Sequence, residues 1–191
     1  MMRCPIYLPS NCNMEIIVRS VKENLNAIKH VEEMMDGLFP EEEQSSVNGL
    51  LELSVNSGVH FDLYYLNGEV CGFSYIVCKY DLVFIYYLAV KEKYQSMGCG
   101  TKILEIIKGF YNNCTLVLNI EPINGQTHNQ VQRLRRLKFY KKNGLKETNY
   151  FLEHKGVEYS ILSSAQNLDT VRYKKLLEDI SCDYMASKIY R

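Results

Sequence analysis

The sequence LVFIYYLAVKEKYQSMGCGT, from Leu82 to Thr101, joins a nine-residue apolar run to a glycine-containing turn that opens a helix. Gly98 and Gly100 lack a Cβ, so the backbone N–H groups of this turn can approach an anion closely. The free N–H groups of a helix start, together with the positive end of its dipole, suit a pyrophosphate. Any tight strand-to-helix turn can use Gly-x-Gly, so the motif alone does not identify a phosphate site.

The chain before this turn predicts an antiparallel meander. Strands at 60–66 and 69–79 flank Asn67-Gly68, a strong hairpin signal, and residues 82–90 follow as a third strand after a turn at Tyr80-Asp81. After the glycine turn we expect a helix and then a strand at 116–120, and such a βαβ unit makes its two strands parallel. The sheet is therefore predicted to be mixed. The expected inward residues of the helix are Ile103, Leu104, Ile107 and Tyr111.

The spacing of apolar residues predicts further elements on both sides. Before the meander we expect a strand at 15–19, a helix at 21–35 with Leu25, Ile28, Val31 and Met35 inward, a solvated helix start at 41–43, and a helix at 47–56 with Leu50, Leu51 and Val55 inward. After the parallel strand we expect a helix at 129–143 closed by Gly144, a hairpin of strands 149–154 and 157–162, and a helix at 168–180. We expect an N-terminal extension at 1–13, one domain at 14–163 and a C-terminal helical extension at 164–191.

Composition narrows the classes of function. The 191 residues include 22 basic and 22 acidic side chains, so no strong field favours nucleic acid or an anionic membrane. No apolar run approaches the roughly 18 residues that a membrane span needs. The seven cysteines form no C-x-x-C pair, and we expect no metal site. An odd cysteine count without an apolar signal segment predicts a cytoplasmic protein.

Two motifs together resemble the GNAT superfamily of acyl-CoA-dependent N-acetyltransferases. In that family a strand ending in Leu-x-Val precedes Arg/Gln-x-x-Gly-x-Gly/Ala, and a later helix ends in Tyr-x-x-x-Gly-Phe. Here Leu88-Ala89-Val90 precedes a turn that starts with Gln95, and the later helix ends Phe139-Tyr140-Lys141-Lys142-Asn143-Gly144-Leu145, with Leu145 in place of Phe. The resemblance implies a mixed α/β (α+β-like) GNAT-type fold. Its central, mostly antiparallel mixed sheet has one parallel, splayed pair of strands and is flanked by helices.

The resemblance also implies acetyl-CoA as a cosubstrate. Leu88 and Val90, on either side of Ala89, would pair through their backbones with the pantetheine arm. The slot between the splayed strands 82–90 and 116–120 would let a backbone N–H polarise the thioester carbonyl. The backbone groups expected to hold the pyrophosphate belong to Gln95, Ser96, Met97, Gly98, Cys99, Gly100 and Thr101.

Tyr140 stands where the family uses a tyrosine to protonate the departing thiolate, and a phenol suits that step. The alternative is that Tyr140 is an aromatic residue on a buried helix face. The 82–90 strand lacks the glutamate that some family members use as a base. Glu121, just past the second parallel strand, is our candidate for taking the amine proton, and a solvated carboxylate or a substrate-binding anion are equal alternatives. Tyr86 and Tyr87 are expected to face opposite sides of the strand, one toward the substrate.

Other residues depart from the family pattern. Arg133 and Arg136 stand where many members have Asn and Ala, and with Arg135 they could meet the cofactor's 3'-phosphate or an anionic acceptor, or form a solvated helix face. Cys99 lies in the glycine turn, where a helix start can lower a thiol pKa, but no histidine neighbours it in sequence. A cysteine nucleophile is therefore disfavoured.

These observations predict an N-acetyltransferase that moves the acetyl group of acetyl-CoA to a primary amine by direct attack in a ternary complex. The expected partner is a small-molecule or peptide amine, with no nucleic acid and no membrane. A homodimer through the C-terminal segment stays open. The alternative is a catalytically weak acyl-CoA sensor or interaction module, which the missing strand carboxylate motivates.

Overall fold

A computed structural model describes residues 14–123 and 129–191. The expected N-terminal extension and residues 124–128, which precede the helix expected at 129–143, lie outside these residues. None of the helices within them has the length and apolar character needed to cross a membrane.

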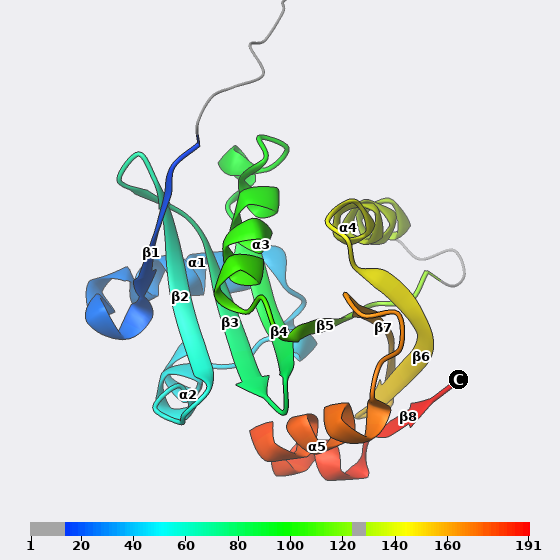
Figure 1. Cartoon of the computed structure of the whole chain (residues 1–191). Coiled ribbons are helices and arrows are strands. Elements are labelled where there is room, and N and C mark those ends of the chain that lie inside the picture. The colour runs from blue at the N-terminus through cyan, green and yellow to red at the C-terminus, as the bar shows by residue number, and fades with distance from the viewer. Residues whose placement is uncertain (1–13, 124–128) are drawn as a thin grey trace, which may run out of the picture.

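A single eight-stranded mixed sheet forms the centre of the fold, in the order β1-β2-β3-β4-β5-β7-β6-β8 (Figure 1). Among residues 14–123 and 129–191, only β4 and β5 pair in parallel, and every other neighbouring pair of strands is antiparallel. The predicted GNAT-type mixed sheet is thus confirmed. The strands are β1 (Ile16–Ser20), β2 (Val59–Leu66), β3 (Glu69–Lys79), β4 (Leu82–Val90), β5 (Thr115–Ile120), β6 (Lys146–His154), β7 (Val157–Ser163) and β8 (Lys188–Tyr190).

Three tight turns set the register of the hairpins. Asn67-Gly68, Tyr80-Asp81 and Lys155-Gly156 each place two consecutive residues at positive φ. This is the geometry of a turn whose twist matches that of the flanking strands. The predicted meander of β2, β3 and β4 therefore forms as expected and delivers the end of β4 into the glycine turn.

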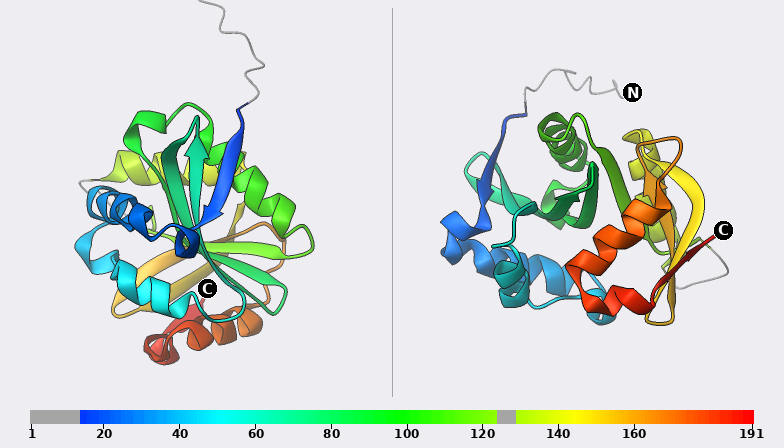
Figure 2. Two further views of the ribbon diagram at one scale, coloured as in Figure 1. Left: turned by 90° about the vertical axis from the view of Figure 1, so that its left-hand side faces the viewer. Right: turned by 60° about the horizontal axis from the view of Figure 1, so that its bottom comes forward.

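Helices cover both faces of the sheet (Figures 1 and 2). α3 and α4 pack on one face, and α1, α2 and α5 pack on the other, each group burying its own apolar cluster. The helices are α1 (Ile28–Leu38), α2 (Val47–Leu53), α3 (Cys99–Phe110), α4 (Gln130–Lys142) and α5 (Thr170–Ile180).

The helix expected at 21–35 is shorter at its start than predicted. Two short 3-10 turns occupy the first part, because Asn24 has an extended backbone (φ −142°, ψ 74°) that interrupts the helix. Leu25 is consequently 61% exposed rather than inward. At the other end, α1 runs through Gly37 to Leu38, and Phe39 is extended as a residue before proline must be.

The helix expected at 47–56 ends early, at Leu53. The Ser54 hydroxyl donates to the carbonyl oxygen of Leu51 at 2.7 Å and so closes the last turn. Val55 therefore lies outside the helix and is exposed instead of inward. The acidic run expected to start a helix forms a 3-10 turn at Glu41–Glu43.

The C-terminal segment packs tightly on the sheet. The side chains of Tyr173, Leu176 and Leu177 on α5 are fully buried. The chain then turns through Cys182–Ala186 and adds β8 to the edge of β6, as the right-hand view of Figure 2 shows. The sequence did not predict β8, because three residues are too few for an alternating pattern.

Leu177→Ala should lower the free energy of unfolding by about 2–5 kcal/mol, because it opens a cavity in a dry core. Val171→Ala, on the exposed side of the same helix, should change it by less than about 0.5 kcal/mol. Urea unfolding of both variants measures the difference. Equal stabilities would mean that α5 is not part of the cooperative core.

Candidate functional site

The parallel strands β4 and β5 separate part of the way along their length. Pairing is confined to Leu82 with Thr115, Val83 with Leu116 and Phe84 with Val117, although both strands are fully described and continue further. A cavity of about 1200 Å³ opens beyond the last pair. Its walls at the gap are Ile85, Leu88 and Ala89 of β4, and Leu118, Asn119 and Ile120 of β5.

A β-bulge changes the direction of side chains at the gap. The register of β3 against β4 shifts so that Tyr75 pairs with Tyr87 and Ile76 with Ile85, which leaves Tyr86 as the extra residue. A bulge breaks the alternation of side chains across a strand. Tyr86 and Tyr87 consequently both line the cavity, with ring centroids 4.6 Å apart, and the expectation that they face opposite sides is wrong.

The glycine turn forms one end of the cavity. Gly98 takes a left-handed conformation (φ 91°), and Gln95 Nε2 donates to the carbonyl oxygen of Val90 at 3.0 Å. The first helical hydrogen bond runs from Lys102 N–H to the oxygen of Gly98, so the N–H groups just ahead of it have no acceptor within the helix. α3 begins at Cys99, inside the glycine turn itself.

Eight of the ten expected cofactor residues line this cavity: Leu88, Ala89, Val90, Gln95, Ser96, Gly98, Gly100 and Thr101. The other two do not. Met97 is 56% exposed, and the Cys99 thiol is buried and donates to Met14 Sδ at 3.7 Å. Burial raises the pKa of Cys99, opposite to the lowering expected for a helix start. The structure thus agrees with excluding a cysteine nucleophile.

Direct contacts join the glycine turn to α4. A Cβ on Gly100 would lie 3.0 and 3.1 Å from two ring carbons of Phe139, so the Phe139 ring would have to shift by a few tenths of an ångström to admit it. Asn143 Nδ2 donates to Thr101 Oγ1 at 3.3 Å, and Lys108 Nζ donates to the Asn143 carbonyl. α3 and α4 therefore form one wall of the cavity, and the Thr101 side chain links the two helices.

The end of α4 places Tyr140 in the cavity wall. Leu145 N–H bonds the carbonyl of Tyr140 and Gly144 N–H bonds that of Lys141, a Schellman cap with Gly144 at φ 81°. Tyr140 is only 8% exposed, and burial raises its pKa to about 12. Its hydroxyl has no hydrogen-bond partner among residues 14–123 and 129–191 and stays protonated at neutral pH.

Glu121 lies against α4, next to the cavity-lining residues Ile120 and Arg136. Its two carboxylate oxygens each lie 2.9 Å from a guanidinium, one from Arg133 and one from Arg136, and Asn129 Nδ2 adds a longer contact. Glu121 is 9% exposed and is not among the residues that line the cavity. This geometry argues against Glu121 as the base, because both oxygens are held by cations. It also explains the two arginines that depart from the family pattern.

A basic stripe on α4 borders the glycine turn. Arg135, Lys138 and Lys142 line the cavity at helical spacing, and Arg135 also donates to the Ser96 hydroxyl. Ser96 has a positive φ of 63°, so this bond supports a strained turn. The stripe gives the glycine-turn end of the cavity a positive charge.

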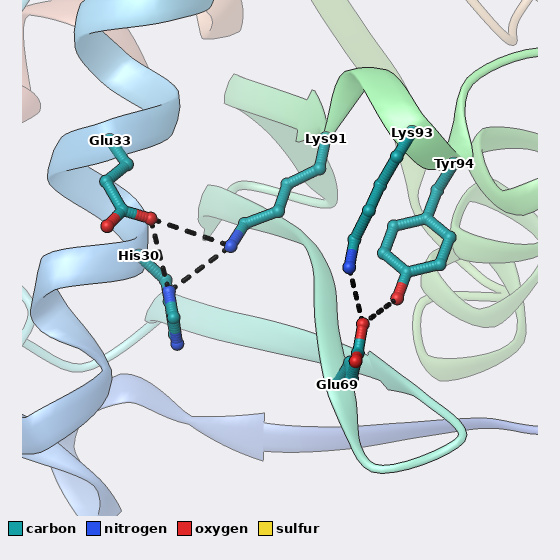
Figure 3. A network of polar contacts seen from close by, with 6 residues as sticks. All are labelled: His30, Glu33, Glu69, Lys91, Lys93 and Tyr94. Carbon is teal, nitrogen blue, oxygen red and sulfur yellow. Dashed lines mark hydrogen bonds and ion pairs between the residues drawn. The ribbon is translucent and has the colours of Figure 1, made fainter.

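Two lysines near the turn are engaged elsewhere (Figure 3). Lys91 contacts His30 at 3.2 Å and Glu33 at 3.7 Å on α1. Lys93 and Tyr94 both bind Glu69 at the β2–β3 hairpin. These contacts fix the segment between β4 and α3, and neither lysine lines the cavity.

The opposite end of the cavity lies on the α1, α2 and α5 face and is rich in aromatic rings. Sequence reasoning missed most of it, because its residues come from distant segments. Tyr159 and His154 could have been found as same-face positions of the last hairpin, whereas no pattern marks Tyr184. The rings at this end are Phe39, Tyr86, Tyr87, His154, Tyr159 and Tyr184.

His154 is held in a fixed orientation there. Its Nδ1 lies 2.7 Å from Ser187 Oγ, and its ring stacks on Tyr184 with centroids 4.1 Å apart. Burial, and then the charge of Lys155, lowers the pKa of His154 below its usual value. The imidazole is therefore neutral at pH 7 and able to accept a proton.

Part of the chain matches a known protein family. Residues 57–147 match the family model described as acetyltransferase (GNAT) domain. No curated protein sequence matches the chain.

Solved structures share the fold at low sequence identity. A putative GNAT-family acetyltransferase from Bacteroides thetaiotaomicron has a TM-score of 0.66 and 19% identity, over 87% of this chain and 94% of that one. An aminoglycoside 6'-N-acetyltransferase complexed with coenzyme A has a TM-score of 0.62 and 16% identity, over 77% of this chain and 95% of that one. The ribosomal-protein-S18-alanine N-acetyltransferase from Escherichia coli has a TM-score of 0.60 and 14% identity, over 81% of this chain and 96% of that one.

Gly100→Ala should destabilise the fold by about 1–3 kcal/mol, because the new methyl group collides with the Phe139 ring. Gly109→Ala in the same helix meets open space and should stabilise by about 0.5–1 kcal/mol. Denaturant unfolding measures the free energy of unfolding of both variants. A Gly100→Ala protein as stable as Gly109→Ala would contradict the described contact between α3 and α4.

Proposed function

The chain belongs to the GNAT superfamily, and on this premise we propose that it transfers the acetyl group of acetyl-CoA to a primary amine by direct attack in a ternary complex. The observation that carries the proposal is the cavity at the gap between β4 and β5. It has a glycine turn and a basic stripe at one end and an aromatic pocket on the opposite face of the sheet. Two reactants can therefore meet at the gap from opposite faces.

The cosubstrate's phosphates fit the glycine-turn end. The N–H groups ahead of Lys102 and the left-handed Gly98 supply an anion cradle. Arg135, Lys138 and Lys142 supply the opposite charge from α4. The pantetheine arm would lie along Leu88 to Val90, where the edge of β4 has no strand partner on the β5 side.

Acetyl transfer at the gap requires two proton transfers. The amine nitrogen bonds to the carbonyl carbon of the thioester, and the carbon–sulfur bond breaks. Tyr140 Oη gives its proton to the departing sulfur, and the nitrogen loses its proton to a base. The products are an N-acetylated amine and the free thiol of CoA. Tyr140 suits this task because burial keeps it protonated.

We assign the role of base to His154 in place of Glu121. His154 lies in the wall of the aromatic pocket, and its ring is positioned by Ser187 and Tyr184. The charged groups around it are Lys155, Asp183 and Lys174. Its neutral form can take the proton of the amine directly or through one water molecule.

Tyr140→Phe should lower kcat by roughly ten- to a thousandfold, with little change in the KM for acetyl-CoA, because only proton donation is removed. The rate of CoA release at a saturating concentration of amine measures kcat. Tyr111→Phe is the matched control, since Tyr111 follows α3 and is not among the cavity-lining residues. Equal loss in both variants would remove the donor role from Tyr140.

The acid limb of kcat/KM should have its midpoint below pH 6.5, because the depressed pKa of His154 keeps the base neutral down to that pH. The His154→Gln variant should lack this acid limb, and its kcat at pH 7 should be lower by at least about a hundredfold. The stability of the wild-type protein should also depend on pH. Its free energy of unfolding should fall as pH drops below about 6.5, because the unfolded state binds the proton on His154 more readily than the folded state does. An acid limb that survives unchanged in His154→Gln would exclude it as the base.

The rival function is an acyl-CoA sensor without turnover. It predicts that acetyl-CoA binds but that no amine releases CoA at neutral pH. The aromatic pocket favours the enzyme, because a sensor has no need of a second reactant site across the sheet.

A further inference from the structure

Asn119 is a polar side chain of β5 in the wall of the cavity, at the gap. Resting on the acetyl transfer proposed above, we infer that Asn119 is a further catalytic residue, whose Nδ2 donates a hydrogen bond to the thioester carbonyl oxygen while that oxygen gains negative charge. Tyr173 of α5 is the positioning residue that orients the Asn119 amide. The inference stands on the contacts of these two side chains at the end of the paired part of β4 and β5.

Asn119 stands where the two parallel strands begin to separate. The last pair of the ladder is Phe84 with Val117. Because side chains alternate along a strand, Asn119 lies on the same face as Val117, which packs in the apolar cluster under α5. The Asn119 side chain is half-buried and lines the cavity. It is therefore the first residue of β5 beyond the ladder on the face of the aromatic pocket.

Tyr173 holds the oxygen end of the Asn119 amide. The Tyr173 side chain is fully buried, and its ring packs edge to face on Phe84 with centroids 5.6 Å apart. Its hydroxyl donates to Asn119 Oδ1 at 2.9 Å. Burial raises the pKa of Tyr173, so the hydroxyl keeps its hydrogen, and a buried hydroxyl needs an acceptor for that hydrogen. The contact with Phe84 and the hydrogen bond together fix which way the amide points.

The nitrogen end of the amide is left to the cavity. Asn119 Nδ2 has no hydrogen-bond partner among residues 14–123 and 129–191, and Oδ1 is held by α5. The Tyr87 hydroxyl, on the same cavity wall, is by contrast bonded to the Glu43 carbonyl at 2.5 Å and lies 3.1 Å from Ser45 Oγ. Asn119 therefore offers an oriented N–H donor at the gap.

A fixed amide donor suits the charge that acetyl transfer creates. As the amine nitrogen bonds to the carbonyl carbon, an electron pair of the C=O bond moves onto the oxygen, and it returns when the carbon–sulfur bond breaks. A donor oriented in advance stabilises the charged oxygen more than the neutral carbonyl, which is what lowers the barrier. The amide neither gains nor loses a proton, so the two proton transfers stay with Tyr140 and His154.

Asn119→Asp separates hydrogen-bond donation from packing, because a carboxylate of the same shape still accepts from Tyr173 but has no N–H. We expect kcat to fall by about a hundred- to a thousandfold and the KM for acetyl-CoA to change by less than about threefold. CoA release is measured with ethylamine, spermidine and a tripeptide with a free amino terminus, and kcat is compared on the fastest of them.

Asn113→Asp is the matched control, since it makes the same change in an exposed turn outside the cavity-lining residues and should leave kcat unchanged. A kcat of Asn119→Asp within about threefold of the wild-type value would overturn the inference.

Tyr173→Phe tests the positioning role, because it keeps the ring on Phe84 and releases the amide. The kcat should fall by about three- to tenfold when Asn119 is present, and no further when Asn119→Ala has already removed the donor. An equal fall in both backgrounds would overturn the positioning role. Tyr64→Phe removes an equally buried hydroxyl, which lies 2.9 Å from Ser74 Oγ and outside the cavity-lining residues, and should leave kcat unchanged.

The infrared spectrum of bound acetyl-CoA, labelled with carbon-13 at the carbonyl, tests the contact without turnover. A hydrogen bond to a carbonyl oxygen lowers its stretching frequency, so the band should lie at higher frequency in Asn119→Ala than in the wild-type protein. Melting temperatures with acetyl-CoA show that both proteins are folded and loaded. An unshifted band, with CoA still released to an amine, would overturn the inference and leave acetyl transfer standing. A shifted band with no CoA release to any of the three amines would support the contact and overturn acetyl transfer.

Discussion

The loss of backbone pairing between β4 and β5 after Phe84 is the constraint on which the site depends. Backbone N–H and C=O groups need partners, so an open ladder in the middle of a sheet is costly unless something else satisfies it. The bulge at Tyr86 disturbs β4 directly after Phe84, where its pairing with β5 ends. The gap then supplies both a route through the sheet and an edge along which an extended ligand can pair.

The two sides of the gap are held by different means. On the α3 and α4 side, the Gly100–Phe139 contact and the Asn143 bridge make the glycine turn and Tyr140 parts of one wall. On the other side, the C-terminal segment brings Tyr184 and His154 together. The glycine turn and the aromatic pocket thereby lie on opposite faces of the sheet, an arrangement that suits the proposed reaction between two substrates.

Local sequence signals predicted the sheet well and the reacting groups less well. Asn67-Gly68 and the apolar run of β4 fix the meander, and Gly144 marks the end of α4, because each signal acts over a few residues. The fate of Glu121 depended instead on two arginines that α4 brings to it, a contact between distant segments. Tyr184 carries no local signal, since only the turn that follows α5 brings it to the cavity wall.

Thermal unfolding of the purified protein with and without acetyl-CoA, after removal of any co-purified ligand, tests the central claim most directly. At a hundredfold excess over the dissociation constant, binding to the folded state adds about 2.7 kcal/mol of stability. For a chain of this length the melting temperature should rise by about 5–10 °C. No rise with ligand-free protein would contradict the claim that the gap between β4 and β5 holds acetyl-CoA.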